Sequence, residues 1–142
     1  MTRILESNSI EDTLAIGEKL GRTAKPGDIY ALIGDLGVGK TAMAQGFAAG
    51  LGIAGPISSP TFTILMEYTE GRLPFYHFDV YRIGDLSELD EIGFEECLYG
   101  EGVTLVEWAD LVWDAMPKET IMIRIEKDLE KGFDYRKIMV EE

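Results

Sequence analysis

Apolar and polar positions along the chain follow two periodicities, which predicts strands interleaved with helices over the first two thirds of the sequence. Short apolar or alternating runs of strand length lie at Asp28–Ile33, Thr61–Tyr68, Leu73–Val80, Val103–Val106, Ile121–Glu126 and Asp134–Val140. Longer mixed stretches that favour a helix span Ile10–Gly21, Lys40–Leu51 and Ser87 to Cys97 or Leu98. This order predicts an α/β fold of three layers around a mainly parallel central sheet.

Local signals refine this outline. The two strands on either side of the turn Glu70-Gly71-Arg72 predict an added β-hairpin, and the last two predicted strands are expected to pair. Ser9 is expected to cap the first helix, with Asp12 at the third helical position as a weak capping box. We find no internal repeat, low-complexity tract or long linker, so we expect a single domain over residues 1–142.

The composition of the chain limits the kinds of binding partner and the cellular compartment that we expect. Asp and Glu outnumber Lys and Arg by 26 to 13, so the net charge of −13 repels phosphate backbones and disfavours direct binding to RNA or DNA. No apolar run approaches the roughly 20 residues of a membrane helix, and the first residues do not have the pattern of a signal peptide. The single cysteine, Cys97, allows no internal disulfide, which fits a reducing compartment such as the cytoplasm.

A phosphate-binding loop is the strongest motif of the chain. The segment Gly34–Thr41 reads GDLGVGKT and matches the P-loop pattern G-x-x-x-x-G-K-[ST], with a predicted strand before it and a helix after it. Its glycines let backbone N–H groups converge on a phosphate, and the following helix directs its positive end at the same anion. Lys40 is expected to reach the β- and γ-phosphates, and Thr41 to bind Mg²⁺. The residues expected to bind ATP here are Asp35, Leu36, Gly37, Val38, Gly39, Lys40, Thr41 and Ala42.

Acidic residues at predicted strand ends are the candidate partners of the metal. Glu107 directly follows Val103–Val106, which places a carboxylate at the edge of the sheet where ligands of open α/β sheets bind. Asp79 lies in an aromatic run, where it could bind the metal through water, position the attacking water, or form an ion pair with Arg82. His77 shares the strand face of Asp79 and could be a general base or a structural histidine.

A P-loop alone leaves the reaction open. The chain has one asparagine, Asn8, so the N-K-x-D box that reads guanine in GTPases is absent and ATP is expected. A small-molecule kinase is one alternative. The six arginines of this chain, however, are not clustered as they are on the lid of such a kinase. A non-enzymatic nucleotide-sensing module is another. The loop Ser58-Ser59-Pro60-Thr61 could sense a γ-phosphate as a switch or simply cap a turn.

Four segments together resemble a known family. These are GDLGVGKT at Gly34–Thr41, SPTF from Ser59, HFDVYR from His77, and EW at Glu107-Trp108; in this order they resemble the bacterial TsaE (YjeE-type) ATPases. The resemblance covers about Ser9 to Pro117. It implies a P-loop NTPase-like fold and a weak ATPase, raised by the TsaB–TsaD complex, that is needed for threonylcarbamoyl modification of adenosine 37 in tRNA. It also implies ATP and Mg²⁺ as cofactors, contact with tRNA only through the complex, and no DNA or membrane partner.

The resemblance also implies roles for individual residues. Lys40, Asp79 and Glu107 would be catalytic, and Thr41, Glu107 and Asp79 would hold Mg²⁺. Ser59, Pro60 and Thr61 would form a first switch and Asp79 would belong to a second. The remaining residues expected to contact ATP are Trp108, Ser9, Thr13 and Arg136.

Overall fold

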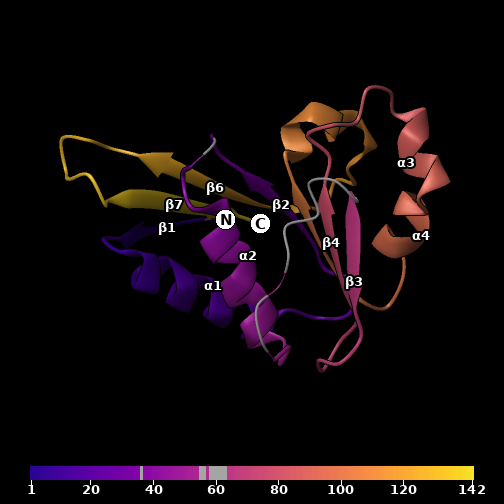
Figure 1. Cartoon of the computed structure of the whole chain (residues 1–142), viewed down its shortest axis with the longest axis horizontal. Helices are drawn as coiled ribbons and strands as arrows, with labels where there is room; N and C mark the ends of the chain where they lie inside the picture. The colour runs from indigo at the N-terminus through magenta and orange to yellow at the C-terminus, as the bar shows by residue number, and fades with distance from the viewer. Residues whose placement is uncertain (36, 55–56, 58–63) are drawn as a thin grey trace.

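The computed structural model describes residues 1–35, 37–54, 57 and 64–142. Strands and helices alternate through most of these residues (Figure 1). In chain order the elements are β1 (Thr2–Ser7), α1 (Ile10–Thr23), β2 (Ile29–Ile33), α2 (Lys40–Gly50), β3 (Leu65–Tyr68), β4 (Phe75–Asp79), α3 (Ser87–Glu91), α4 (Phe94–Leu98), β5 (Val103–Glu107), the 3₁₀ segment η1 (Ala109–Ala115), β6 (Ile121–Lys127) and β7 (Arg136–Glu141). In the described residues, no helix combines the length and apolar character that a membrane span needs.

The described strands form one sheet of seven strands in the order β1-β7-β6-β2-β5-β4-β3. The four central strands β6, β2, β5 and β4 are parallel to one another. β7 and β1 at one edge and β3 at the other are antiparallel to their neighbours, which confirms the hairpin and the pairing of the last two strands. The carboxyl ends of β2, β4 and β5 therefore meet at the same edge of the sheet, where open α/β folds bind their ligands.

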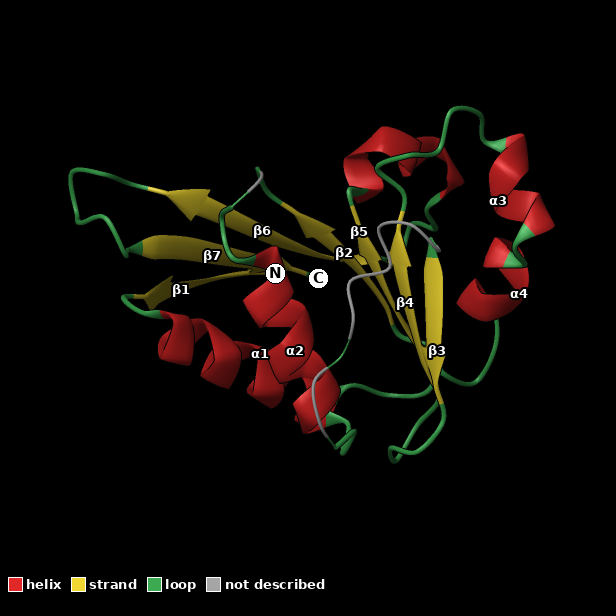
Figure 2. Cartoon of the chain, in the orientation of Figure 1, coloured by secondary structure: helices red, strands yellow, loops and turns green. Residues whose placement is uncertain are grey.

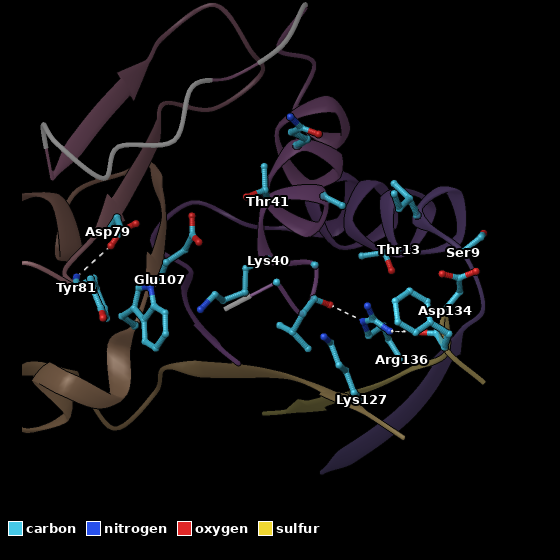
Figure 3. A pocket seen from close by; sticks show the side chains of 18 of the residues that line it. Ser9, Thr13, Lys40, Thr41, Asp79, Tyr81, Glu107, Lys127, Asp134 and Arg136 are labelled. Atoms are coloured by element: carbon cyan, nitrogen blue, oxygen red, sulfur yellow. Dashed lines mark hydrogen bonds between the residues drawn. The ribbon is translucent and has the colours of Figure 1, made fainter. Parts of the chain in front are cut away.

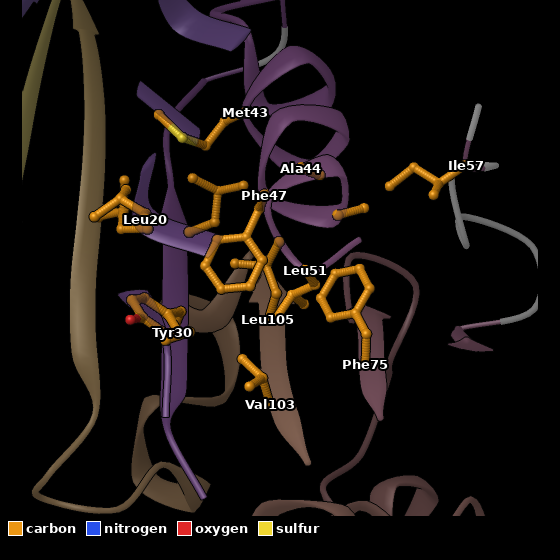
Figure 4. Packing of buried hydrophobic residues seen from close by; sticks show 14 of the residues in the cluster. Leu20, Tyr30, Met43, Ala44, Phe47, Leu51, Ile57, Phe75, Val103 and Leu105 are labelled. Carbon is orange, nitrogen blue, oxygen red and sulfur yellow. The ribbon is translucent and has the colours of Figure 1, made fainter. Parts of the chain in front are cut away.

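Helices cover both faces of this sheet, as the three-layer prediction requires (Figure 2). Buried side chains of α1 and α2 pack on one face, where Phe47 meets Tyr30 edge to ring and Phe75 with the ring planes tilted by 35° (Figure 4). α3, α4 and η1 contribute to a second apolar cluster on the other face, which includes Phe78 and Val106. β2 is buried along its whole length, as a central parallel strand should be.

α1 and α2 approach each other so closely that only glycine fits at four positions, Gly17, Gly21, Gly46 and Gly50. A Cβ added at Gly21 would lie 2.1 Å from the carbonyl oxygen of Phe47. One added at Gly46 would lie 2.2 Å from the carbonyl oxygen of Leu14. The two helices therefore touch through their backbones, which fixes the position of the loop from which α2 begins.

The structure corrects the sequence-based outline in four places. The single helix expected over Ser87–Leu98 is wrong, because Gly93 has a φ of +73° and divides the stretch into α3 and α4. β1 was not expected, and β5 includes Glu107 as its last residue. The Ser9 hydroxyl caps α1 by accepting from the Asp12 N–H at 3.1 Å, but the Asp12 carboxylate accepts from the N–H of Asn8 rather than of Ser9.

Candidate functional site

The phosphate-binding loop has the backbone that its glycines allow. Gly37 has a φ of +75° and Gly39 a φ of +113°, both in a region that residues with a Cβ rarely adopt. Gly39 is the N-cap of α2, an 11-residue helix, so the free N–H groups of its first turn are available to an anion. Leu36 lies outside the described residues. The loop thus presents backbone donors and a helix N-terminus at one place.

Lys40 is held at the start of α2 by two contacts of its ammonium group. It is 6% exposed, and its Nζ donates to the carbonyl oxygen of Gly34. The same Nζ lies 3.3 Å from the ring centroid of Trp108, which gives a cation–π contact. Burial lowers the pKa of Lys40, and the surrounding carboxylates, Glu107 first among them, act in the opposite direction. A cation is therefore kept beside the loop, ready for an anionic ligand.

The two predicted acids end neighbouring strands. Asp79 and Glu107 are paired in register between the parallel strands β4 and β5, and each is 5% exposed. Both side chains lie on the sheet face that α2 covers, since they continue the alternation from Phe75 and Val103. Oδ1 of Asp79 accepts from the N–H of Tyr81 at 3.0 Å. The register thus places two carboxylates side by side at the carboxyl edge of the sheet.

His77 contacts one of these acids directly. Its Nε2 lies 2.6 Å from Oε2 of Glu107, and the ring is 1% exposed. The ring also stacks on Phe75, with centroids 5.8 Å apart and planes 14° apart. The sequence placed His77 beside Asp79 on one strand, but gave no sign of its contact with Glu107, because that contact depends on the register between β4 and β5.

A cavity of about 780 Å³ lies above the loop and gathers most of the predicted residues (Figure 3). The predicted residues that line it are Ser9, Thr13, Gly37, Val38, Gly39, Lys40, Thr41, Ala42, Asp79, Glu107, Trp108 and Arg136. Asp35 instead lines a second cavity of about 570 Å³, which Val38 and Trp108 also border. Ser59, Pro60 and Thr61 lie outside the described residues. One cavity thus brings together residues that are nearly the whole chain apart.

Ser9, Thr13 and Arg136 form the wall of the cavity farthest from the acids (Figure 3). Thr13 is buried and exchanges a hydrogen bond of 2.7 Å with the hydroxyl of Ser7. Nε of Arg136 donates to the carbonyl oxygen of Val38 at 2.8 Å, so β7 supports the loop. The first turn of α1 and the start of β7 are therefore fixed against the phosphate-binding loop.

Further residues of the cavity were not expected from the sequence: Ile10, Gln45, Tyr81, Arg82, Lys127, Phe133 and Asp134. Phe133 is 81% exposed and Ile10 70% exposed, so two large apolar side chains of the cavity wall are open to solvent. Tyr81 packs on Trp108 with ring centroids 4.7 Å apart. Nothing in the local sequence marks Phe133, because it follows Lys131-Gly132 in a polar turn. The alternation of HFDVYR could have suggested Tyr81 as the neighbour of a strand-end acid.

The chemistry of these donors suits a nucleotide triphosphate and a small hard cation. Backbone N–H groups and an ammonium group bind phosphate, whereas the Thr41 hydroxyl and carboxylate oxygens are ligands that Mg²⁺ prefers. Thr41 is exposed to the cavity and both carboxylates line it. In the part of the chain that the structure describes, no three His, Cys, Asp or Glu side chains cluster as a self-sufficient metal site. A metal held here would therefore also need ligands from the phosphates or from water.

Comparison with known proteins gives the family. The sequence model described as "Threonylcarbamoyl adenosine biosynthesis protein TsaE" matches residues 7–138. The chain belongs to the TsaE family. A Bacillus subtilis protein named tRNA threonylcarbamoyladenosine biosynthesis protein TsaE is 49% identical over 128 residues, which are 90% of this chain and 78% of that protein. The protein of the same name from Treponema pallidum is 44% identical over 119 residues, 84% of this chain and 87% of that protein.

A solved structure agrees with this TsaE assignment. The crystal structure of Bacillus subtilis YdiB superposes with a TM-score of 0.85 and 41% sequence identity, and covers 99% of this chain and 84% of that chain. The three-layer α/β arrangement described above is therefore shared with a related protein of known structure. The matched range of the TsaE family model contains the loop, both acids and Arg136, so the whole cavity lies within the family's shared region.

Proposed function

We propose that this chain is a Mg²⁺-dependent ATPase that supports threonylcarbamoyl modification of adenosine 37 in tRNA. It would act on a TsaB–TsaD-type complex by binding and hydrolysing ATP, and it would not transfer the threonylcarbamoyl group itself. The family and the names of the relatives support the role in tRNA modification. The observation that carries the ATPase part is that Lys40, Asp79 and Glu107 line one cavity with the glycine loop.

The loop and Lys40 would bind the phosphates. Backbone N–H groups between Gly37 and Thr41, together with the N-terminus of α2, supply donors that do not need to reorganise when an anion arrives. The Lys40 ammonium donates to Gly34 and faces Trp108. Phosphate oxygens are stronger acceptors than a carbonyl group or an aromatic ring, so we expect Lys40 to leave these contacts for the ligand.

Thr41, Glu107 and Asp79 are the residues that would hold Mg²⁺. When bound, the ion would neutralise negative charge on the phosphates. Asp79 lies beside Glu107 and accepts a backbone N–H from Tyr81 through one oxygen. That hydrogen bond orients the carboxylate toward the cavity, where it could accept a hydrogen bond from the attacking water. Burial of both acids strengthens their interaction with any cation in the cavity.

The charge of the chain agrees with an accessory role. With a net charge of −13 the protein has little means of neutralising a tRNA backbone. Contact with tRNA through a partner complex removes this need. The same charge would steer the chain toward a basic protein surface. A protein, rather than tRNA, is therefore the partner that we expect this chain to bind.

Replacement of Lys40 tests the proposal. Lys40→Ala should weaken ATP binding by about 10- to 100-fold, because a charged hydrogen bond contributes about 1.5–3 kcal/mol. Lys19→Ala is the matched control, since Lys19 is exposed on α1 and does not line the cavity. Binding is measured with a fluorescent ATP analogue, and phosphate release is measured with and without a TsaB–TsaD pair. Normal binding and turnover in Lys40→Ala would refute the assignment of the site.

A further inference from the structure

The site contains a buried histidine that the proposed chemistry does not use. His77 does not line the cavity with Asp79 and Glu107, yet it is 1% exposed and lies directly behind Glu107. A buried imidazole needs a hydrogen-bond partner, since desolvation of an unpaired polar group is unfavourable. Its Nε2 has one, Oε2 of Glu107 at 2.6 Å. Among the described residues, Nδ1 has none.

These contacts determine where the ring carries its proton. A carboxylate oxygen only accepts hydrogen bonds, so the ring nitrogen that meets one carries a proton. Nε2 therefore donates to Oε2 of Glu107. Stacking on Phe75, which is fully buried, holds the plane of the ring. The donor is thus fixed in direction by the apolar core beneath it.

We propose that His77 is a positioning residue for Glu107. Its N–H occupies Oε2, so it holds the rotamer of the glutamate and leaves the other carboxylate oxygen for the cavity. An unsupported glutamate has three rotatable bonds and would lose their freedom each time it bound a cation. Groups behind a metal ligand that fix its orientation typically contribute 10- to 100-fold to metal affinity or activity. This inference rests on the proposed function, in which Glu107 holds Mg²⁺.

Two substitutions separate the donor from the ring. His77→Phe keeps an aromatic ring that can stack on Phe75 but removes the N–H. His77→Gln loses the ring but can place an amide N–H near the position of Nε2. We expect His77→Phe to raise the Mg²⁺ concentration needed for half-maximal tight ATP binding by about 10- to 100-fold. His77→Gln should restore much of the loss. A purely structural histidine would give the opposite order, because the phenylalanine packs better.

ATP binding is measured by titrating Mg²⁺ against a fluorescent ATP analogue, and folding is checked by thermal unfolding. A normal Mg²⁺ response in folded His77→Phe protein would overturn the inference alone, and so would a glutamine variant as impaired as the phenylalanine variant. Failure of the unsubstituted chain to bind ATP would overturn the proposed function, and the inference with it. The two failures are therefore distinguishable.

A second measurement needs no nucleotide and begins with the unsubstituted chain. The chain contains one histidine, so ¹⁵N-histidine labelling gives the NMR signals of His77 alone. The unsubstituted chain should show a proton on Nε2 and slow exchange of that proton with water. In Glu107→Gln that exchange should become faster, because a neutral amide holds the N–H less strongly. An Nε2 without a proton in the unsubstituted chain would overturn the inference.

Discussion

Arg136 and Val38 are joined by a hydrogen bond of 2.8 Å from Nε to the backbone carbonyl oxygen, across 98 positions of the sequence. Nη1 of the same arginine donates to the carbonyl oxygens of Phe133 and Tyr135. A single guanidinium group thus fastens the phosphate-binding loop to the beginning of β7. Arg136 also lines the cavity, so its support of the loop and its predicted contact with ATP can act together.

Arg136→Lys should therefore weaken ATP binding even though it keeps the charge. Lysine has no planar fork of donors and cannot serve three carbonyl oxygens in these directions. We expect the free energy of unfolding to fall by about 1–3 kcal/mol, the typical effect of losing a charged hydrogen bond. Chemical denaturation and nucleotide titration measure the two effects. Lys137→Arg, the neighbouring position on β7, is the control and should change neither; an Arg136→Lys protein with unchanged properties would contradict the supporting role.

Gly39→Ala should disable the loop by its backbone conformation. The φ of +113° at Gly39 is strained for any residue with a Cβ, and nothing within 4 Å of an added Cβ would clash. The loss of ATP binding therefore reports the conformation of the loop and not crowding. Gly84→Ala is the matched control, because that glycine has no positive φ and an added Cβ meets only the Glu88 side chain at 3.8 Å. Equal ATP affinity in both variants would contradict the prediction.

Gly46→Ala should destabilise the protein although alanine is the better helix former. The gain in helix propensity is about 1 kcal/mol. The added Cβ, 2.2 Å from the Leu14 carbonyl oxygen, must force α1 and α2 apart, and overpacking of this kind typically destabilises by about 1–3 kcal/mol. We expect a net loss of stability in thermal unfolding. Ala49→Gly, on the exposed side of α2, isolates the propensity effect; a Gly46→Ala protein more stable than the unsubstituted chain would show that the helices can separate freely.

Trp108 should report the binding of nucleotide. Lys40 lies 3.3 Å from its ring centroid, so a ligand that draws the ammonium away changes the electric field on the indole. The chain has two tryptophans, Trp108 and Trp113, and only Trp108 lines a described cavity. ATP should change the fluorescence of Trp113→Phe protein, where Trp108 alone emits. The fluorescence of the reciprocal Trp108→Phe protein should change little, and a signal found mainly there would contradict the prediction.

Much of the fold was predictable because local signals agree with it. The buried run of β2, the glycine loop and the start of α2 follow one another in the sequence as they do in the structure. The single helix over Ser87–Leu98 failed because its apolar spacing continues across Gly93, and only packing decides that this glycine takes a positive φ. β1 could not be predicted, because a short, mostly exposed strand has little hydrophobic pattern and depends on its pairing with β7.

The residues of the candidate site that lie within a local sequence motif, or directly at its end, could be predicted from the sequence. Lys40 belongs to the loop, and Glu107 and Asp79 end apolar or aromatic runs. The contacts between motifs were not predictable. His77 meets Glu107, and Arg136 meets Val38, only because the strand order and register bring distant segments together. The roles of these residues in ATP and Mg²⁺ binding stay predictions until the variants above are measured.

The direct backbone contact of α1 with α2 has a mechanical consequence. The first turns of both helices border the cavity, through Thr13 on one and Thr41 on the other. Helices that contact each other through their backbones cannot slide or tilt independently. We therefore expect this half of the cavity to move as one rigid unit. Any change of shape that accompanies a reaction must then be expressed on the opposite half, at the strand ends and in η1 around Trp108. A partner protein that senses the state of the nucleotide would find its signal on that side.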